Sequence, residues 1–233
     1  MIVYTWPDTF GVEALHLRIV PNTRGFTSPF TRQAQFARLE GARWVADLEL
    51  ISLTFAEANN LSAFLHRLDG RTGSIAFHDP SRVTPAGNAA GGHVGAASDF
   101  SDGTKFSDNT QFADGSDFGQ LDAVANRDDD TIVIRGLVPS VTAFEPGDLL
   151  QLADIHDDLG SQLLEVQDQA QADATGKTRV VIRPRLRRSH PAGTQITFRE
   201  PKGVFRLASD TLGQPRRRHV IAEGHALQFI ENV

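Results

Sequence analysis

The sequence contains no cysteine, so disulfides, thiolate zinc sites and cysteine nucleophiles are excluded together. Its net charge of -6 leaves no overall basic field, and we expect no specific nucleic-acid binding by the surface as a whole. No apolar run approaches the ~18 residues that indicate a transmembrane helix, and the first residues carry neither the basic nor the apolar region of a signal peptide. The composition, with 40% hydrophobic and 22% charged residues, is that of an ordinary folded protein. We therefore expect neither secretion nor membrane insertion.

Catalytic motifs are equally scarce. His78-Asp79 and His156-Asp157 place an imidazole beside a carboxylate, but adjacent side chains of an extended chain point apart, and no nucleophile motif accompanies either pair. The eight histidines show no H-x-x-x-H or H-E-x-x-H spacing, so no catalytic metal is expected. The glycines within 91–95 lack the Gly-Lys-Ser/Thr ending of a phosphate loop. The sequence predicts a protein that is not an enzyme and holds no cofactor.

The segment from residue 48 to residue 78 predicts a strand, an amphipathic helix and a second strand. Thr54 and Glu57 have the spacing of a capping box, in which each side chain binds a backbone N–H that the first helical turn leaves unpaired. Gly70 tolerates a positive φ angle where the helix should end. The apolar stripe of this helix consists of Ala58, Leu61, Phe64, Leu65 and Leu68. Such a stripe needs a sheet to lie on.

Most of the remaining sequence is typical of strands and loops. Apolar and polar residues alternate from Glu13 to Val20, which predicts a half-buried strand. We expect further strands within 33–38, 43–53 and 75–77. The turn-rich residues from 21 to about 31 predict a loop rather than part of the ladder.

A second β region predicts a small barrel or sandwich. Its five short strands are expected at 132–134, 149–152, 162–166, 179–182 and 195–198. Two strands follow, at 203–207 and 225–230, and the last should return to the first sheet because it has no helix of its own to cover it. We therefore expect a mainly β fold with three parts: a domain made of 1-80 and 201-233 with its helix at 54-69, a Gly/Ala linker and repeat loop at 81-130, and an inserted small β-barrel at 131-200.

A short repeat lies between the two β regions. Phenylalanine recurs every six residues at Phe100, Phe106, Phe112 and Phe118, and the aspartates that follow by two positions are Asp102, Asp108 and Asp114. Each Asp-Gly or Asp-Asn pair predicts a tight turn, with the aromatic rings stacked on one another. The aspartates could bind a cation, as in calcium-binding nonapeptide repeats. Because the period is six and no Gly-Gly-x-Gly-x-Asp unit is present, we favour turns that pack against a neighbouring subunit, without metal.

Two arginine clusters stand out in a chain of negative net charge. They could contact phosphate, but neither is interleaved with the aromatic residues that nucleic-acid readers use for stacking. We favour a protein interface in which they meet the acidic repeat, or Asp128 to Asp130, of another copy. The candidate interface consists of Arg183, Arg185, Arg187, Arg188, Arg216, Arg217 and Arg218, together with the four phenylalanines of the repeat.

The segment from Trp44 to Pro80 combines a strand, the capped helix, the exit Leu68-Asp69-Gly70-Arg71 and the strand that ends in His78-Asp79-Pro80. It resembles the hub domain of distal tail proteins of long-tailed phages. The Phe-Ser-Asp-Gly repeat is similar to inserts in tail and tail-tip proteins of siphophages and related gene transfer agents. Segments that resemble the downstream part of such proteins are 145–152, 173–176, 183–187 and 201–207.

The resemblance implies a virion protein at the phage tail tip, assembled in the host cytoplasm. In this family a homo-oligomer, usually a hexameric ring, joins the tail tube protein to the baseplate or receptor-binding proteins. The family also implies a β-sandwich hub with one helix, and an inserted barrel of an OB-like or galectin-like kind. Its motifs are structural and imply no catalytic residue.

Three functions remain as hypotheses. The one we favour is a structural tail hub that forms a closed ring, because the split β architecture lacks any catalytic constellation. The second is a glycan-binding accessory module of the tail tip, although residues 131 to 200 offer no aromatic groove by sequence. The third is a tail-attached hydrolase, which no motif supports.

Overall fold

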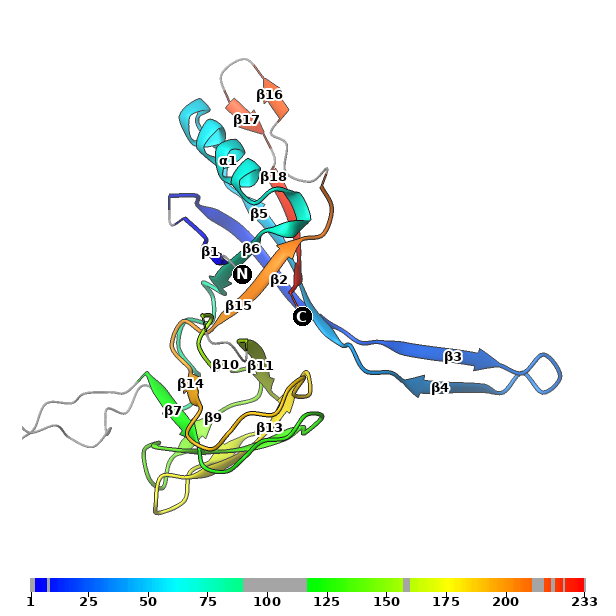
Figure 1. Ribbon diagram of the computed structural model, residues 1–233, viewed down its shortest axis with the longest axis vertical. Coiled ribbons are helices and arrows are strands. Elements are labelled where there is room, and N and C mark those ends of the chain that lie inside the picture. Colours follow the sequence, from blue (N-terminus) through cyan, green and yellow to red (C-terminus); the bar gives the residue numbers. More distant parts are fainter. Residues whose placement is uncertain are drawn as a thin grey trace, which may run out of the picture. The chain divides into compact units, whose positions relative to one another are not determined.

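The computed structural model describes residues 3–7, 9–89, 117–156, 160–210, 216–218, 221–223 and 225–232, with the backbone alone for 216–218, 221–223 and 225. The chain divides into two compact units (Figure 1). The first consists of Met1–Phe77 and Val204–Val233, and the second is His78–Gly203. The second unit is therefore inserted in the sequence of the first.

The first unit is built on a six-stranded sheet with the order β1-β6-β15-β18-β5-β2. β1 pairs with β6 in parallel, whereas the pairs β15–β18, β18–β5 and β5–β2 are antiparallel. The final strand thus lies in the middle of the sheet, where it completes the core. The strand bounds are β1 (Val3–Thr5), β2 (Val12–Val20), β5 (Arg43–Leu50), β6 (Ser74–His78), β15 (Lys202–Leu207) and β18 (His225–Glu231).

Helix α1 (Phe55–Arg67) is the one α-helix among the described residues, and it begins as the sequence predicts. The backbone N–H of Glu57 donates to Thr54 Oγ1 at 3.4 Å, and the backbone N–H of Thr54 donates to Glu57 Oε2 at 2.8 Å. The predicted stripe is buried. After the helix, Asp69 and Gly70 both adopt positive φ angles of 51° and 63°, and the short 3₁₀ turn η1 (Gly70–Thr72) follows.

Aromatic rings join the helix to the sheet. The ring of Phe64 on α1 lies 6.0 Å from that of Trp6, which lies 6.2 Å from Phe229 on β18. Phe77 of β6 stacks on Phe205 of β15 with ring centroids 4.4 Å apart. Rings contributed from both ends of the chain therefore fill one core beneath the helix, as offset and edge-to-face packing favours.

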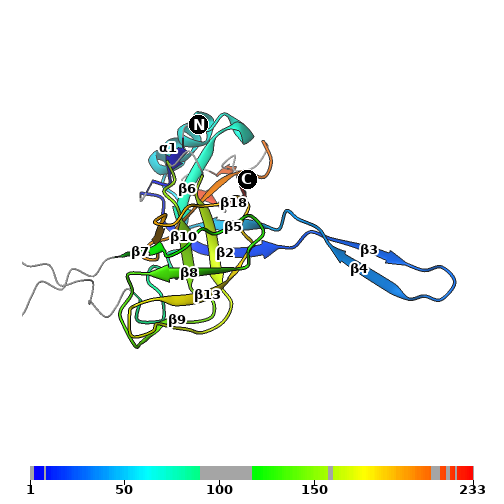
Figure 2. The same cartoon turned by 60° about the horizontal axis from the view of Figure 1, so that its bottom comes forward.

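A hairpin of β3 (Thr23–Thr27) and β4 (Ala34–Arg38) extends out of the first unit, continuing β2 and β5 (Figures 1 and 2). The prediction of a loop from residue 21 to about 31 was wrong for residues 23–27, which form a regular antiparallel ladder with 34–38. Residues 28–31 do form a turn, at the tip of the hairpin. Pro21-Asn22 and Ser28-Pro29 flank the first strand, and the five residues between them pair with the second strand, Gly25 included. We call residues 21–39 the arm.

The second unit is a closed barrel with the strand order β10-β11-β13-β8-β7-β14. A two-stranded sheet of β9 (Thr142–Phe144) and β12 (Ala170–Gln171) accompanies it. The barrel strands are β7 (Phe118–Leu121), β8 (Thr131–Arg135), β10 (Leu149–Leu152), β11 (Gln162–Val166), β13 (Thr178–Arg183) and β14 (Gln195–Thr197). The predicted mainly β class, with one helix and a small barrel, is confirmed among the described residues.

The barrel begins earlier than residue 131, at which the sequence placed its start. β7 closes the barrel by pairing with both β14 and β8. It contains the last phenylalanine of the repeat, Phe118, so the sequence assigned this strand to the repeat loop. Only the pairing with strands distant in sequence shows that it belongs to the barrel.

Residues 81–89 are also not the loose linker that their small side chains suggest. Asn88 and Ala89 donate backbone hydrogen bonds to Thr142 and Ala143 at 2.8 and 2.9 Å, and Ala89 is buried in the barrel core. A Cβ added at Gly87 would lie 2.3 Å from the carbonyl oxygen of Ala143. Glycine and alanine here permit close backbone contact, which is why a composition typical of linkers also fits a docked segment.

Candidate functional site

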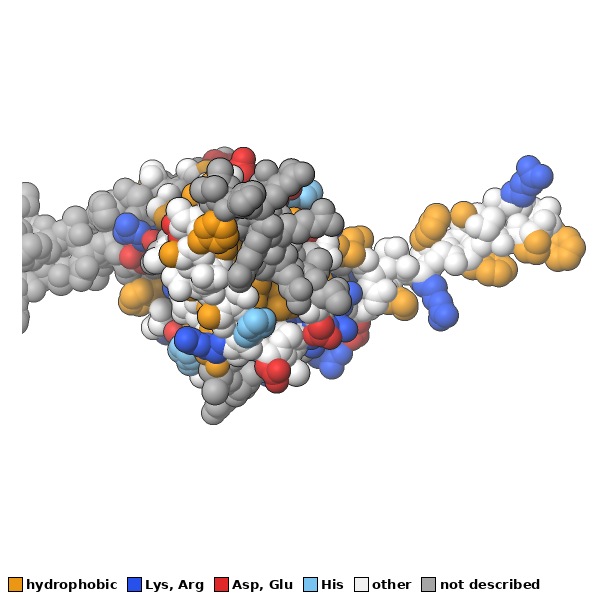
Figure 3. Space-filling view, turned by 90° about the horizontal axis from the view of Figure 1, so that it is seen from above, with side chains coloured by type: hydrophobic (Ala, Val, Ile, Leu, Met, Phe, Trp, Pro, Cys, Tyr) orange, Lys and Arg blue, Asp and Glu red, His pale blue; other side chains and the backbone are white. Residues whose placement is uncertain are grey.

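The arm presents large apolar side chains to solvent. Phe26 is 65% exposed, Phe36 is 78% exposed and Phe30, at the tip, is 94% exposed. Figure 3 shows hydrophobic and basic side chains along this projection. Monomeric proteins expose single apolar residues routinely, but three largely exposed phenylalanines on one projecting hairpin are typical of a contact surface.

Hydrogen bonds hold the arm in a defined shape. At its base, Asn22 Nδ2 donates to the carbonyl oxygen of Glu40 at 2.6 Å. At its tip, the backbone N–H groups of Ser28 and Arg32 donate to the carbonyl oxygens of Gln33 and Ser28, both at 2.9 Å. The exposed rings are therefore carried by a closed ladder with an ordered turn.

The pairing register decides which residues share a face of the arm. Residues directly opposite in an antiparallel pair point to the same side, and successive residues alternate. Because Phe26 pairs with Gln35 and Arg24 with Ala37, these four residues form one face. The other face consists of Thr23, Gly25, Thr27, Ala34, Phe36 and Arg38. Each face thus has one phenylalanine and one arginine.

The arm is basic in an acidic chain. It contains Arg24, Arg32 and Arg38 and no aspartate or glutamate, so its charge of +3 within a chain of -6 leaves -9 for all other residues. Sequence reasoning did not single the arm out. The alternation of small and large residues from 23 to 27, and the lack of acidic residues from 21 to 39, are the signals that could have indicated it.

The sheet of the first unit also ends in a long edge. β2 pairs with β5 on one side, and no strand among the described residues pairs with its other side. An unpaired edge of nine residues offers backbone N–H and C=O groups to another chain. It lies beside the base of the arm, since β2 leads directly into β3.

The arginine cluster at 183–188, predicted as an interface, is used within the chain. Arg183 Nη1 lies 3.4 Å and Arg185 Nη2 3.1 Å from Asp130 Oδ2. The hydrogen bond from Arg183, together with the charges of both arginines, holds the pKa of Asp130 below its usual range despite some desolvation. The acidic partner that we expected from another copy is thus provided by the same barrel.

The last two arginines of this cluster also lie against their own barrel. The backbone N–H of Arg187 donates to Gln162 Oε1 at 3.0 Å. The guanidinium of Arg188 lies close to Gly160, since a Cβ built there would be 3.5 Å from Arg188 Nη1.

The structure describes only some of the other predicted site residues. Arg216–Arg218 form β16, which pairs with β17 (Ile221–Glu223), while their side chains lie outside the described residues. Phe100, Phe106 and Phe112, with Asp102, Asp108 and Asp114, also lie outside them. Within the described ranges no group of three or more His, Asp or Glu side chains is arranged to hold a metal ion.

Phe118 is described, and it lies on the outer face of the barrel at 45% exposure. It pairs with Thr197 of β14, and two residues on, Gln120 pairs with Gln195 and with Arg135. Arg135 Nη2 donates to Gln120 Oε1 at 3.0 Å. An exposed ring therefore lies among amide, hydroxyl and guanidinium groups.

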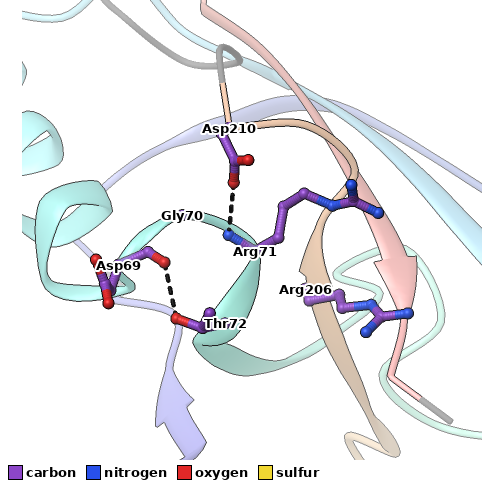
Figure 4. A pocket seen from close by; sticks show the side chains of 6 residues that line it. All are labelled: Asp69, Gly70, Arg71, Thr72, Arg206 and Asp210. Atoms are coloured by element: carbon purple, nitrogen blue, oxygen red, sulfur yellow. Dashed lines mark hydrogen bonds between the residues drawn. The ribbon is translucent and has the colours of Figure 1, made fainter.

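A polar depression of about 710 Å³ lies at the end of α1 (Figure 4). The backbone N–H of Arg71 donates to Asp210 Oδ1 at 2.9 Å, and Thr72 Oγ1 donates to the carbonyl oxygen of Asp69 at 2.8 Å. With Arg206, the lining has two arginines and two aspartates, so its charges balance. These hydrogen bonds stabilise the turn that follows the helix, and they do not indicate a ligand for the depression.

No family model matches the chain, and no curated protein shows significant similarity to it. Among the described residues, no helix is long and apolar enough to cross a membrane. The arm is the most distinctive exposed feature of the part of the chain that the structure describes.

Proposed function

We propose that this protein is a structural subunit that assembles with copies of itself into a closed ring, as a tail hub of a long-tailed phage. The observation that supports this proposal is the exposed aromatic arm. A rigid hairpin that is basic and carries three exposed phenylalanines is suited to contact another surface rather than to remain in solvent.

The contact is heterologous. The arm of one copy meets a different surface of the next copy, so every subunit gives one arm and receives one, and such contacts close into rings when the rotation permits. The unpaired edge of β2 beside the arm adds a second feature that another chain could satisfy.

Burial of the exposed rings supplies enough free energy for a weak contact between two copies, and closing the ring adds a second contact for each subunit. Fully burying a phenylalanine contributes roughly 1.5–3 kcal/mol. Because the three rings are 65%, 78% and 94% exposed, covering them supplies about 4–7 kcal/mol at each contact. Association costs at least about 4 kcal/mol. A single pair would be marginal, whereas a ring gives every subunit two contacts.

The resemblance to distal tail proteins supports the remaining parts of the proposal. The ring has six copies, lies at the virion tail tip, and joins the tail tube protein to the baseplate or receptor-binding proteins. The role is architectural and not enzymatic.

The first experiment is negative-stain electron microscopy of the purified full chain together with its mass in solution. We expect a closed ring with a central channel. The variant combining Phe26→Ser, Phe30→Ser and Phe36→Ser should be monomeric, whereas Phe118→Ser, which removes an exposed ring elsewhere, should leave the ring intact. A wild-type chain that stays monomeric at high concentration and adds no density to a tail tip would overturn the proposal.

A second candidate function, glycan binding by the barrel, is favoured by Phe118. The sequence offered no aromatic groove within 131 to 200, where Phe144 and Phe198 are both buried, but β7 adds an exposed ring to the outer face of the barrel. An exposed ring beside Gln120, Arg135 and Gln195 can stack on a sugar while the polar groups bind hydroxyls, and small barrels of the OB type do bind oligosaccharides.

A glycan array probed with the full chain tests this second function. We expect binding that Phe118→Ala removes and that the triple arm variant retains. An array that shows no binding by the wild-type chain would eliminate the glycan hypothesis without affecting the ring.

A further inference from the structure

We infer that the arm inserts into an acidic cleft of a second copy of this chain and is covered there on both of its faces. The inference rests on the proposed assembly and specifies its contact. It follows from the two-sided distribution of aromatic and basic residues on the hairpin.

A hairpin that lies flat on one surface has an apolar face toward that surface and a polar face toward water. This arm differs, because Phe26 lies on one face and Phe36 on the other, both largely exposed. Hydrophobic and basic side chains stand on both sides of the projection in Figure 3. Contact on one side alone would leave one phenylalanine in solvent, so both faces need a covering surface.

The tip adds a third group of the same kind. Phe30 is the most exposed of the three rings, and Arg32 follows it with a φ angle of 56° at the end of the turn. Phe30 at the tip would therefore enter a pocket of the partner first. Buried aromatic anchors at the centre of an interface commonly contribute most of its binding energy.

Gly25 keeps the arm thin. A Cβ added at this position would lie only 2.9 Å from the ring of Phe36, which is its cross-strand partner. The ring therefore lies over the glycine backbone instead of standing away from the hairpin. This geometry suits entry into a narrow cleft, and a side chain at position 25 would force the ring outward.

The charges of the arm indicate that the partner surface which covers it is acidic. Arg24 lies on one face, Arg38 on the other and Arg32 at the tip, with no acidic residue between them to neutralise these charges. All other residues of the chain together carry -9. A second copy is thus a partner of complementary charge, and like charges keep the arms themselves apart.

Site-specific photocrosslinking tests the two-sided contact. The full chain is made with the photoreactive residue benzoyl-phenylalanine, in separate variants Phe26→benzoyl-phenylalanine and Phe36→benzoyl-phenylalanine. We expect both variants to crosslink to another copy, at two different peptides that include aspartate or glutamate. A matched pair of charge reversals, Arg24→Glu and Arg38→Glu, should each weaken self-association about 10-fold, which corresponds to about 1.4 kcal/mol. Arg179→Glu, an exposed arginine of the barrel, serves as the control and should change little.

The outcomes separate this inference from the proposed function. If a ring forms but only one of the two positions crosslinks, or only one charge reversal weakens association, the arm lies on a single surface and the inference fails while the ring stands. If both positions crosslink to a different protein and not to another copy, the inference is also wrong. A chain that forms no ring and no crosslink overturns the proposed function as well.

Discussion

The carboxylate of Asp148 binds the backbone of Ala86 and Gly87, and its removal should destabilise the second unit. Asp148 is only 6% exposed. It accepts hydrogen bonds from the backbone N–H groups of Ala86 at 2.7 Å, Glu145 at 2.8 Å and Gly87 at 3.4 Å. One side chain thus satisfies donors from two segments that are about 60 residues apart.

The magnitude follows from the donors that Asp148→Ala would leave without an acceptor. An unsatisfied buried donor costs about 1–3 kcal/mol, and two of the three bonds are short, so the expected loss is about 3–5 kcal/mol of unfolding free energy. Asp148→Asn retains one carbonyl oxygen but no charge, and should lose about half as much.

Urea unfolding and amide hydrogen exchange measure the effect. The amides of Asn88 and Ala89, which donate to the β9 strand, should exchange faster in Asp148→Ala than in the wild type. Asp168→Ala removes an exposed aspartate of the same unit and should change stability by less than about 0.5 kcal/mol. If Asp148→Ala costs no more than this control, or exchange at residues 88 and 89 is unchanged, the carboxylate does not hold the segment.

Two further predictions concern the cap of the helix and the loss of stability at low pH. Thr54→Ala removes the cap of α1 and should cost about 1 kcal/mol of unfolding free energy, measured by urea unfolding. The control Ser62→Ala, within the same helix, should cost less than about 0.5 kcal/mol. Equal effects of the two variants would contradict the role of Thr54 as the cap. Burial raises the pKa of Asp79, but hydrogen bonds from Ser81 and Arg82 outweigh this effect and hold the pKa below its ordinary value. Because the unfolded chain then binds the proton at higher pH than the folded one, this stabilisation is fully present above about pH 4 and is lost as the pH falls through the folded pKa. Asp79→Asn should therefore flatten the fall in unfolding free energy as the pH drops below about 4, relative to the wild type, and an unchanged slope would refute the assignment.

Local signals in the sequence predicted local structure well. Thr54 and Glu57 are three residues apart, and the apolar stripe of α1 repeats every three or four residues, so the beginning of the helix and its buried face follow from short-range geometry. The alternation from Glu13 to Val20 likewise predicted a strand that is half buried in the structure. In these segments the residues that interact are close neighbours along the chain.

The candidate site was predicted less well. The sequence directed attention to the arginines around Arg183, yet the structure pairs two of them with Asp130 of the same barrel. It assigned residues 21 to about 31 to a loop, yet residues 23–27 form a strand of the arm, whose exposed rings now support the proposed assembly. Whether an arginine meets its own aspartate or a partner's, and whether a phenylalanine is buried or exposed, depends on contacts between residues far apart in sequence.

The sequence by itself determined the mainly β class, the capped helix and its buried stripe, because hydrophobic periodicity and capping act within a few residues. Only the tertiary structure decided that β7 closes the barrel, that Ala86 and Gly87 bind Asp148, and that the arm carries an aromatic ring on each face. Strand pairing joins residues whose order along the chain does not specify their neighbours, and a shift of one residue in register reverses the face on which every side chain lies. For this reason the contact surface of the arm could be assigned only once its pairing register was known.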